Sequence, residues 1–162
     1  MVYIQKILFL TYESLPNIFE NQLDFQKHKK GPIAGVIEEN IHIFSSSRLI
    51  EGFGFGLSDW GNELYYLIEP RVKEPLKSTL LDYKDFVIDL TEDELLTFIY
   101  ARFPEYSANS EEWDRLKPKR VKHALSMLKK EKISVSMAAE IADMNYYEFE
   151  DLARKQKIRW KS

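Results

Sequence analysis

The chain has 162 residues, 44% of them hydrophobic and 14% aromatic, which is enough for one substantial domain or for a medium domain plus a small one. It has no cysteine and only three histidines, which excludes disulfides and thiolate chemistry and argues against a zinc site. No apolar run is long enough to span a bilayer, and the opening segment is too short for a signal peptide. We therefore expect a cytoplasmic protein without metal or cofactor.

The small net charge of −3 conceals a division along the chain. Residues 1–114 hold 10 basic and 20 acidic side chains, whereas residues 115–162 hold 13 basic and 6 acidic ones. This asymmetry favours a basic element that faces a polyanion and an acidic element with another role. Electrostatic attraction between the two halves is the alternative.

The first part of the chain predicts a β-containing domain. Alternating and β-branched residues suggest a strand at 2–10, a hairpin of 36–37 and 41–44, a strand pair at 49–55 and 64–68, and a strand at 85–90. Residues 26–32, QKHKKGP, predict a basic loop that ends in a Gly-Pro breaker.

Two features of this first part invite a chemical interpretation. The segment 52–56, GFGFG, lacks the Lys-Ser/Thr of a phosphate loop, so a strand or tight loop with Phe53 and Phe55 on one side is the better interpretation. Carboxylates at Asp82, Asp85 and Asp89 could hold the metal ions of a nuclease, a third and unlikely alternative.

Helical periodicity follows from residue 91 onward. Thr91 and Glu94 form a capping-box pattern that begins a helix, and Phe103-Pro104 ends it. A linker with a short helix around 111–116 precedes a helix that starts near Pro118. The predicted fold class is thus α+β, with an acidic domain at 1–104, a linker at 105–117 and a basic all-helical module at 118–162.

The module contains a helix-turn-helix pattern at residues 134–158. Small residues at Ala138, Ala139 and Ala142 permit close helix approach, and Phe149 and Leu152 supply the apolar face of the second helix. Ser134 and Asn145 are the expected N-caps, with Glu148 completing a capping box on the second helix. An ordinary helical hairpin is the alternative.

In a DNA-binding helix-turn-helix, the N-terminal end of the second helix enters the major groove and the preceding helix holds phosphates. His123 belongs with the basic residues that begin that preceding helix. The candidate nucleic-acid-binding residues are Lys119, Arg120, Lys122, Ser136, Asn145, Tyr146, Tyr147 and Arg154. Acidic residues at Glu148, Glu150 and Asp151 oppose this interpretation and favour recognition of protein by the same helix.

Residues 123–158 resemble a small prokaryotic helix-turn-helix family of uncharacterised, antitoxin-like proteins described as partners of PIN-type toxins. The shared segments are 124–129, 132–142 and 148–152. Asp143 stands where that family usually carries glycine, which Asp can replace because it tolerates a left-handed turn.

The resemblance and the residues together imply a non-enzymatic DNA-binding regulator. It would act as an antitoxin or autorepressor, with the N-terminal domain binding a protein partner such as a toxin. A homodimer is expected, because one small helix-turn-helix buries too little surface for specific affinity. A protein–protein adaptor is the alternative.

Overall fold

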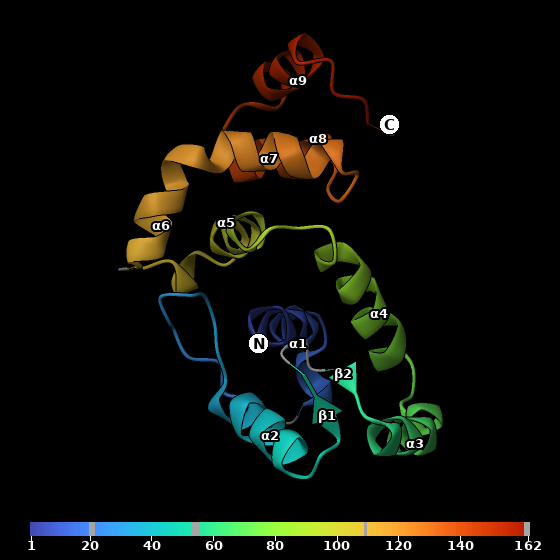
Figure 1. Cartoon of the computed structure of the whole chain (residues 1–162). Coiled ribbons are helices and arrows are strands. Elements are labelled where there is room, and N and C mark those ends of the chain that lie inside the picture. Colours follow the sequence, from blue (N-terminus) through green and yellow to red (C-terminus); the bar gives the residue numbers. More distant parts are fainter. Residues whose placement is uncertain (20–21, 53–55, 109, 161–162) are drawn as a thin grey trace. The chain divides into compact units, whose positions relative to one another are not determined.

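A computed structural model describes residues 1–19, 22–52, 56–108 and 110–160 of the chain. It is mostly helical, with one small antiparallel sheet (Figure 1). Its α-helices are α1 (Val2–Ser14), α2 (Gly35–Ser46), α3 (Asp59–Ile68), α4 (Leu76–Val87), α5 (Glu92–Arg102), α6 (Glu111–Leu116), α7 (Arg120–Lys129), α8 (Val135–Ala142) and α9 (Tyr146–Lys155). Short 3-10 turns lie at Pro16–Ile18, Glu69–Arg71, Pro104–Tyr106 and Lys117–Lys119.

The sheet consists of β1 (Ile50–Glu51) and β2 (Gly56–Leu57), with Ile50 opposite Leu57 and Glu51 opposite Gly56. Within the predicted strand at 49–55, the described residues that form a strand are Ile50 and Glu51. Residues 64–68, predicted to pair with that strand, belong to α3 instead. The predicted orientations of Phe53 and Phe55 lie outside the described residues.

The other predicted strands are wrong, because residues 2–10 and 36–44 lie in helices and residues 85–90 form the end of a helix and a turn. Residues 2–10 belong to α1, where Gln5, Lys6, Phe9 and Leu10 are buried with a helical period of about four. Residues 36–44 belong to α2, whose Ile37 and Ile41 share one buried face. Residues 38–40, which lie between the two predicted hairpin strands, are exposed residues of that helix.

Segment 85–90 holds the end of α4 and the turn that precedes α5. β-branched residues misled the prediction in all three segments, because strand propensity depends on neighbouring strands, and the described residues provide none there.

By its contacts the chain divides into two compact units. One contains residues 1, 3–25 and 33–84; the other contains residues 2, 26–32 and 85–162. The division by contacts falls near residue 84, and loop 26–32 belongs to the C-terminal unit.

In the N-terminal unit, α1 contacts the loop that precedes α2. The Gln5 side chain accepts a hydrogen bond from the Ala34 backbone N–H (3.0 Å) and donates one to the Ala34 carbonyl (3.2 Å). Phe9 and Phe25 pack edge to face, with ring centroids 5.2 Å apart. These contacts satisfy a buried amide and anchor an apolar core on one side of α1.

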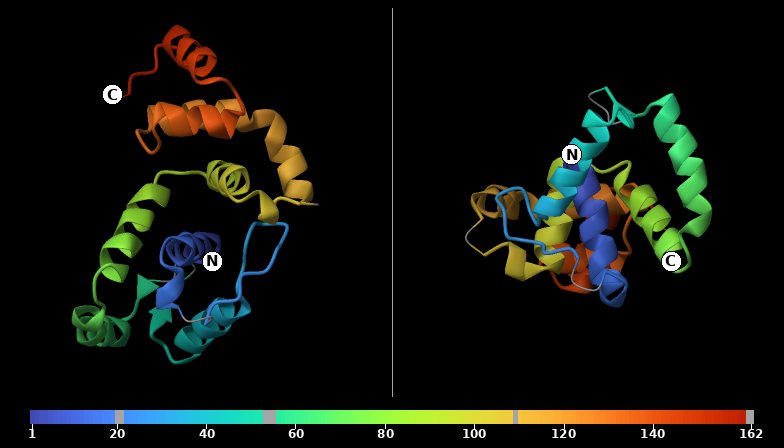
Figure 2. Two further views of the ribbon diagram at one scale, coloured as in Figure 1. Left: turned by 180° about the vertical axis from the view of Figure 1, so that it is seen from behind. Right: turned by 90° about the horizontal axis from the view of Figure 1, so that it is seen from below.

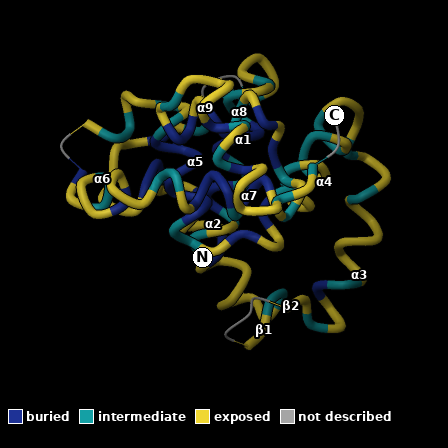
Figure 3. The backbone as a smooth tube through the Cα atoms, turned by 90° about the horizontal axis from the view of Figure 1, so that it is seen from above, coloured by how far each residue is buried: buried dark blue, intermediate teal, exposed yellow. Residues whose placement is uncertain are grey.

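The C-terminal unit is built on α5, which is almost entirely buried and contacts α7 and α8 (Figure 3). The capping box of Thr91 and Glu94 forms as predicted. Glu94 is 4% exposed, and its carboxylate accepts a hydrogen bond from Lys130 Nζ at 2.7 Å. Burial would raise the pKa of Glu94, but the hydrogen bonds of Lys130, Ser126 and Thr91 together lower it.

His123 is a second buried polar group of this unit. Its Nδ1 lies 2.7 Å from Thr97 Oγ1, and burial lowers its pKa because the imidazolium form loses solvation. His123 is only 8% exposed. The expectation that it faces phosphates is therefore wrong, and it instead joins α7 to α5.

Candidate nucleic-acid interface

The segment predicted to be a helix-turn-helix module is helical: it contains α7, α8 and α9, and α8 contacts both other helices (Figures 1 and 2). Ala138, Ala139 and Ala142 are at most 3% exposed, and Phe149 and Ala153 of α9 are fully buried. Because these three α8 residues are alanines, α9 can approach the backbone of α8 closely.

A three-residue turn joins α8 to α9. Asp143 adopts the left-handed conformation, with φ 53° and ψ 50°, and its backbone N–H donates to the Glu140 carbonyl at 3.0 Å. The Met144 N–H donates to the Ala139 carbonyl at 3.0 Å, which satisfies a second carbonyl at the end of α8. The turn thereby reverses the chain without leaving these C-terminal carbonyls unpaired.

The caps of both helices form, with one difference from the prediction. The Ser134 side chain accepts a hydrogen bond from the Met137 N–H, as expected. The Asn145 Oδ1 accepts from the Tyr147 N–H at 2.9 Å, but Glu148 makes no reciprocal bond, so the predicted capping box is absent from α9. Capping therefore occupies the side-chain carbonyl oxygen of Asn145.

Tyr146 and Tyr147 occupy the first turn of α9. They are 40% and 73% exposed, and their rings meet edge to face with centroids 5.4 Å apart. Two exposed aromatic rings at the start of the second helix form a surface that can contact bases or sugar-phosphate, as the sequence predicts.

Both candidate arginines are held by acidic neighbours inside the module. Arg120 forms an ion pair with Asp143, the left-handed residue of the turn. Arg154 pairs with Glu150 at 2.7 Å, and its guanidinium lies 5.3 Å from the centre of the Trp160 ring. The sequence analysis placed Asp143 in the turn but did not predict its ion pair with Arg120, and it did not predict the contact of Arg154 with Trp160.

The lysines and Ser136 are exposed as expected. Lys119 and Lys122 lie at the start of α7, and Ser136 lies in the first turn of α8. Lys122 and Lys129 also border a groove of about 470 Å³ whose apolar floor includes Val121, Leu125 and Ile158. Exposed lysines therefore border α7 at both ends, at Lys119, Lys122 and Lys129.

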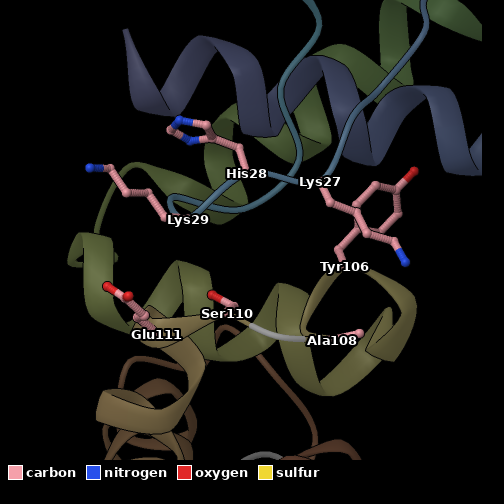
Figure 4. Close-up of a pocket in the computed structure, with 7 residues that line it drawn as sticks. All are labelled: Lys27, His28, Lys29, Tyr106, Ala108, Ser110 and Glu111. Atoms are coloured by element: carbon pink, nitrogen blue, oxygen red, sulfur yellow. The ribbon is translucent and has the colours of Figure 1, made fainter.

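The basic loop 26–32 contributes unexpectedly to this unit. The Tyr100 hydroxyl donates to the Lys29 carbonyl at 2.9 Å, and the Ser110 hydroxyl donates to the Tyr100 oxygen at 3.2 Å. A pocket of about 420 Å³ lies between the loop and the segment around Ser110 (Figure 4).

The lysines of this pocket do not converge on one point. Figure 4 shows Lys27 beside Tyr106, whereas His28 and Lys29 point to the other side and Glu111 lies below them. The pocket is therefore a basic surface without the geometry of a dedicated anion site.

Among the acidic residues around the third alternative's cluster, Asp89 and the neighbouring Asp93 are engaged by cations. Asp93 accepts two hydrogen bonds from Arg115, at 2.6 and 3.0 Å, and these bonds lower its pKa. Asp89 pairs with Lys132 at 2.7 Å. In the described part of the chain, no group of three or more His, Cys, Asp or Glu side chains is placed to hold a metal ion.

Comparison with family models, curated proteins and solved structures finds no match to this chain. A search of the described helices also finds none that is both long enough and apolar enough to cross a membrane.

Proposed function

We propose that this protein is a non-enzymatic DNA-binding regulator whose C-terminal unit contacts DNA through α9 and the start of α7. The observation that carries the proposal is the pair of exposed tyrosines on the first turn of α9, directly after a tight left-handed turn. In helix-turn-helix proteins this turn of the second helix meets the base edges. Lys119 and Lys122 are the phosphate contacts we assign to the preceding helix.

The proposal includes an antitoxin-like or autorepressor role and a homodimeric state. In this role the N-terminal unit binds a protein partner, for which a toxin is the class suggested by the resemblance. Dimerisation matches the need of a small helix-turn-helix for two half-sites.

Fluorescence polarisation with a labelled duplex of about 30 base pairs tests DNA binding, because that length holds two half-sites. The probe is the region upstream of the protein's own gene, and a shuffled duplex is the comparison. Tyr147→Ala should weaken specific binding about tenfold or more, since it removes a contact worth more than about 1 kcal/mol. Tyr66→Ala, at a tyrosine with nearly the same exposure (72% against 73%), is the matched control.

A salt titration separates phosphate contacts from base contacts. Lys122→Ala should reduce the slope of log affinity against log salt by about 0.9, the value for one lost phosphate contact. Lys84→Ala, an exposed lysine of the N-terminal unit, should leave the slope unchanged. Absence of binding to either duplex at low salt would refute the proposal.

A protein–protein adaptor remains the second candidate, and a specific observation favours it. Glu148 and Asp151 are exposed on α9, while Arg120 and Arg154 are engaged by acidic neighbours. A surface with this charge fits a basic protein better than a phosphate backbone. Co-purification of a stoichiometric partner that Glu148→Lys/Asp151→Lys releases, with no DNA binding by the wild type, would favour the adaptor.

A further inference from the structure

Helix α3 of the N-terminal unit exposes an apolar stripe. Trp60, Leu64, Leu67 and Ile68 follow the i, i+4, i+7, i+8 spacing of one helical face, and they are 64%, 36%, 65% and 48% exposed. Figure 3 shows most of α3 as exposed. Such a face normally packs against a core, so its exposure in one chain indicates a surface that another molecule covers.

Gly61 lies one helical turn before Leu64 and two turns before Ile68, at the edge of the stripe, and it marks where α3 meets the rest of the N-terminal unit. Gly61 is buried, and a Cβ at that position would lie 1.9 Å from the Leu49 carbonyl oxygen. Ser58 caps the helix by accepting a hydrogen bond from the Gly61 N–H at 3.0 Å, and its own hydroxyl donates to the Arg48 carbonyl at 2.6 Å. The backbone of α3 is thus held closely at Gly61, beside the stripe, while the four stripe residues stay exposed.

We propose that the stripe is a homodimer contact, in which α3 packs antiparallel against α3 of a second copy around a two-fold axis near Leu64. The spacing suits this arrangement, because Trp60 and Ile68 lie four residues either side of Leu64. Trp60 of one chain then packs on Ile68 of the other, in the self-complementary manner of a two-fold interface.

The charges flanking the stripe support the antiparallel direction. Asp59 and Glu63 lie toward the N-terminal end of α3, and Arg71 and Lys73 follow its C-terminal end; all four are exposed. Glu69, the acidic residue at the C-terminal end, pairs with Lys77. Antiparallel packing brings the acidic end of each helix to the basic end of its partner, whereas parallel packing brings like charges together.

The area is that of a modest dimer. From the exposed fractions, the four stripe residues offer roughly 400 Å² per chain, about half of the ~800 Å² that each partner buries in a standard interface. Tyr65 and the flanking charged residues lie beside the stripe and supply the rest. We therefore expect a dimer with a dissociation constant in the micromolar range.

Sedimentation analysis of the full-length protein without DNA tests the contact independently of the proposed function. The wild type should shift from monomer to dimer as its concentration rises through the micromolar range. Leu67→Glu should weaken the dimer at least about tenfold, because it places a charge in the stripe. Ile88→Glu, at an isoleucine with 66% exposure outside α3, is the control and should dimerise as the wild type does.

Two further experiments test the direction of the helices. Asp59→Arg and Arg71→Asp should each weaken the dimer, and the double variant should restore it. Because the chain has no cysteine, single-cysteine variants also report on geometry. Leu64→Cys should cross-link across the axis, whereas the two cysteines of a Trp60→Cys dimer lie about 12 Å apart along the helices and should not.

The outcomes are decisive in both directions. A wild type that stays monomeric to about 100 μM, roughly a hundred times the expected scale, would overturn the proposal, as would a dimer that Leu67→Glu leaves intact. Efficient cross-linking of Trp60→Cys would overturn the antiparallel arrangement. Loss of DNA binding with an intact dimer would count only against the proposed function.

Discussion

The ion pair between Arg120 and Asp143 leads to a prediction about Asp143→Gly. This variant should raise the affinity for DNA while leaving the free energy of unfolding nearly unchanged. In the wild type, a non-glycine residue occupies a left-handed conformation at φ 53°, and its carboxylate holds Arg120 at the end of the turn. Glycine removes the backbone strain and the carboxylate together.

The two effects on stability nearly cancel. Relief of the left-handed conformation is worth about 0.5–1 kcal/mol for an aspartate, which tolerates it better than most residues. Loss of an ion pair whose Asp143 side chain is 71% exposed costs about 0.5–1 kcal/mol. The free energy of unfolding should therefore change by less than about 0.5 kcal/mol, as measured by urea denaturation.

The effect on DNA affinity should be much larger. Glycine removes one negative charge from the turn and releases Arg120 for a phosphate contact. Affinity should rise about 3–10-fold at moderate salt, and the salt slope should steepen by about 0.9. Arg120→Ala in the Asp143→Gly background is the control and should remove the steeper slope. An unchanged slope in Asp143→Gly would refute the idea that the ion pair restrains Arg120.

Two predictions concern the core of the C-terminal unit. Lys130→Met leaves the buried Glu94 carboxylate without its cation and should destabilise the protein by about 2 kcal/mol at pH 7, as measured by urea denaturation. The pKa of Glu94 is lowered in the folded state. The stabilising contribution of the pair is therefore present above pH 4.5 and is lost as the pH drops through the folded pKa. An equal effect at pH 7 and pH 3 would contradict this reasoning. His123 also has a lowered pKa, so the unfolded state binds the proton more readily and stability should fall as the pH drops below about 6.5. His123→Gln should lack this part of the pH dependence of the free energy of unfolding. If stability falls by the same amount in the variant, other groups cause the fall.

The C-terminal module was the part that local reasoning predicted well. Its boundaries come from caps at Ser134 and Asn145 and from small residues at fixed spacing, all of which act within one or two helical turns. The exposed tyrosines of α9 followed from the same pattern, because the buried positions of Phe149 and Ala153 fix which face looks outward.

The N-terminal segments were harder, because short apolar runs fit a strand or a helix. In α2, burial of Ile37 and Ile41 is a helical spacing, yet the same residues also fit a hairpin when no tertiary partner is known. A strand needs hydrogen-bonding partners from other segments, whereas a helix satisfies its own backbone. The sequence analysis chose strands for these segments, whereas in the described part of the chain the structure forms helices there.

By itself, then, the sequence determined what depends on near neighbours: the helix caps, the turn at Asp143 and the division of charge along the chain. Tertiary structure decided which distant groups meet. It brings loop 26–32 to Tyr100, Lys130 to Glu94 and Arg120 to Asp143, and it leaves the apolar stripe of α3 exposed beside Gly61. These contacts join residues 23 to 71 positions apart, or depend on a close backbone approach, so no local pattern could specify them.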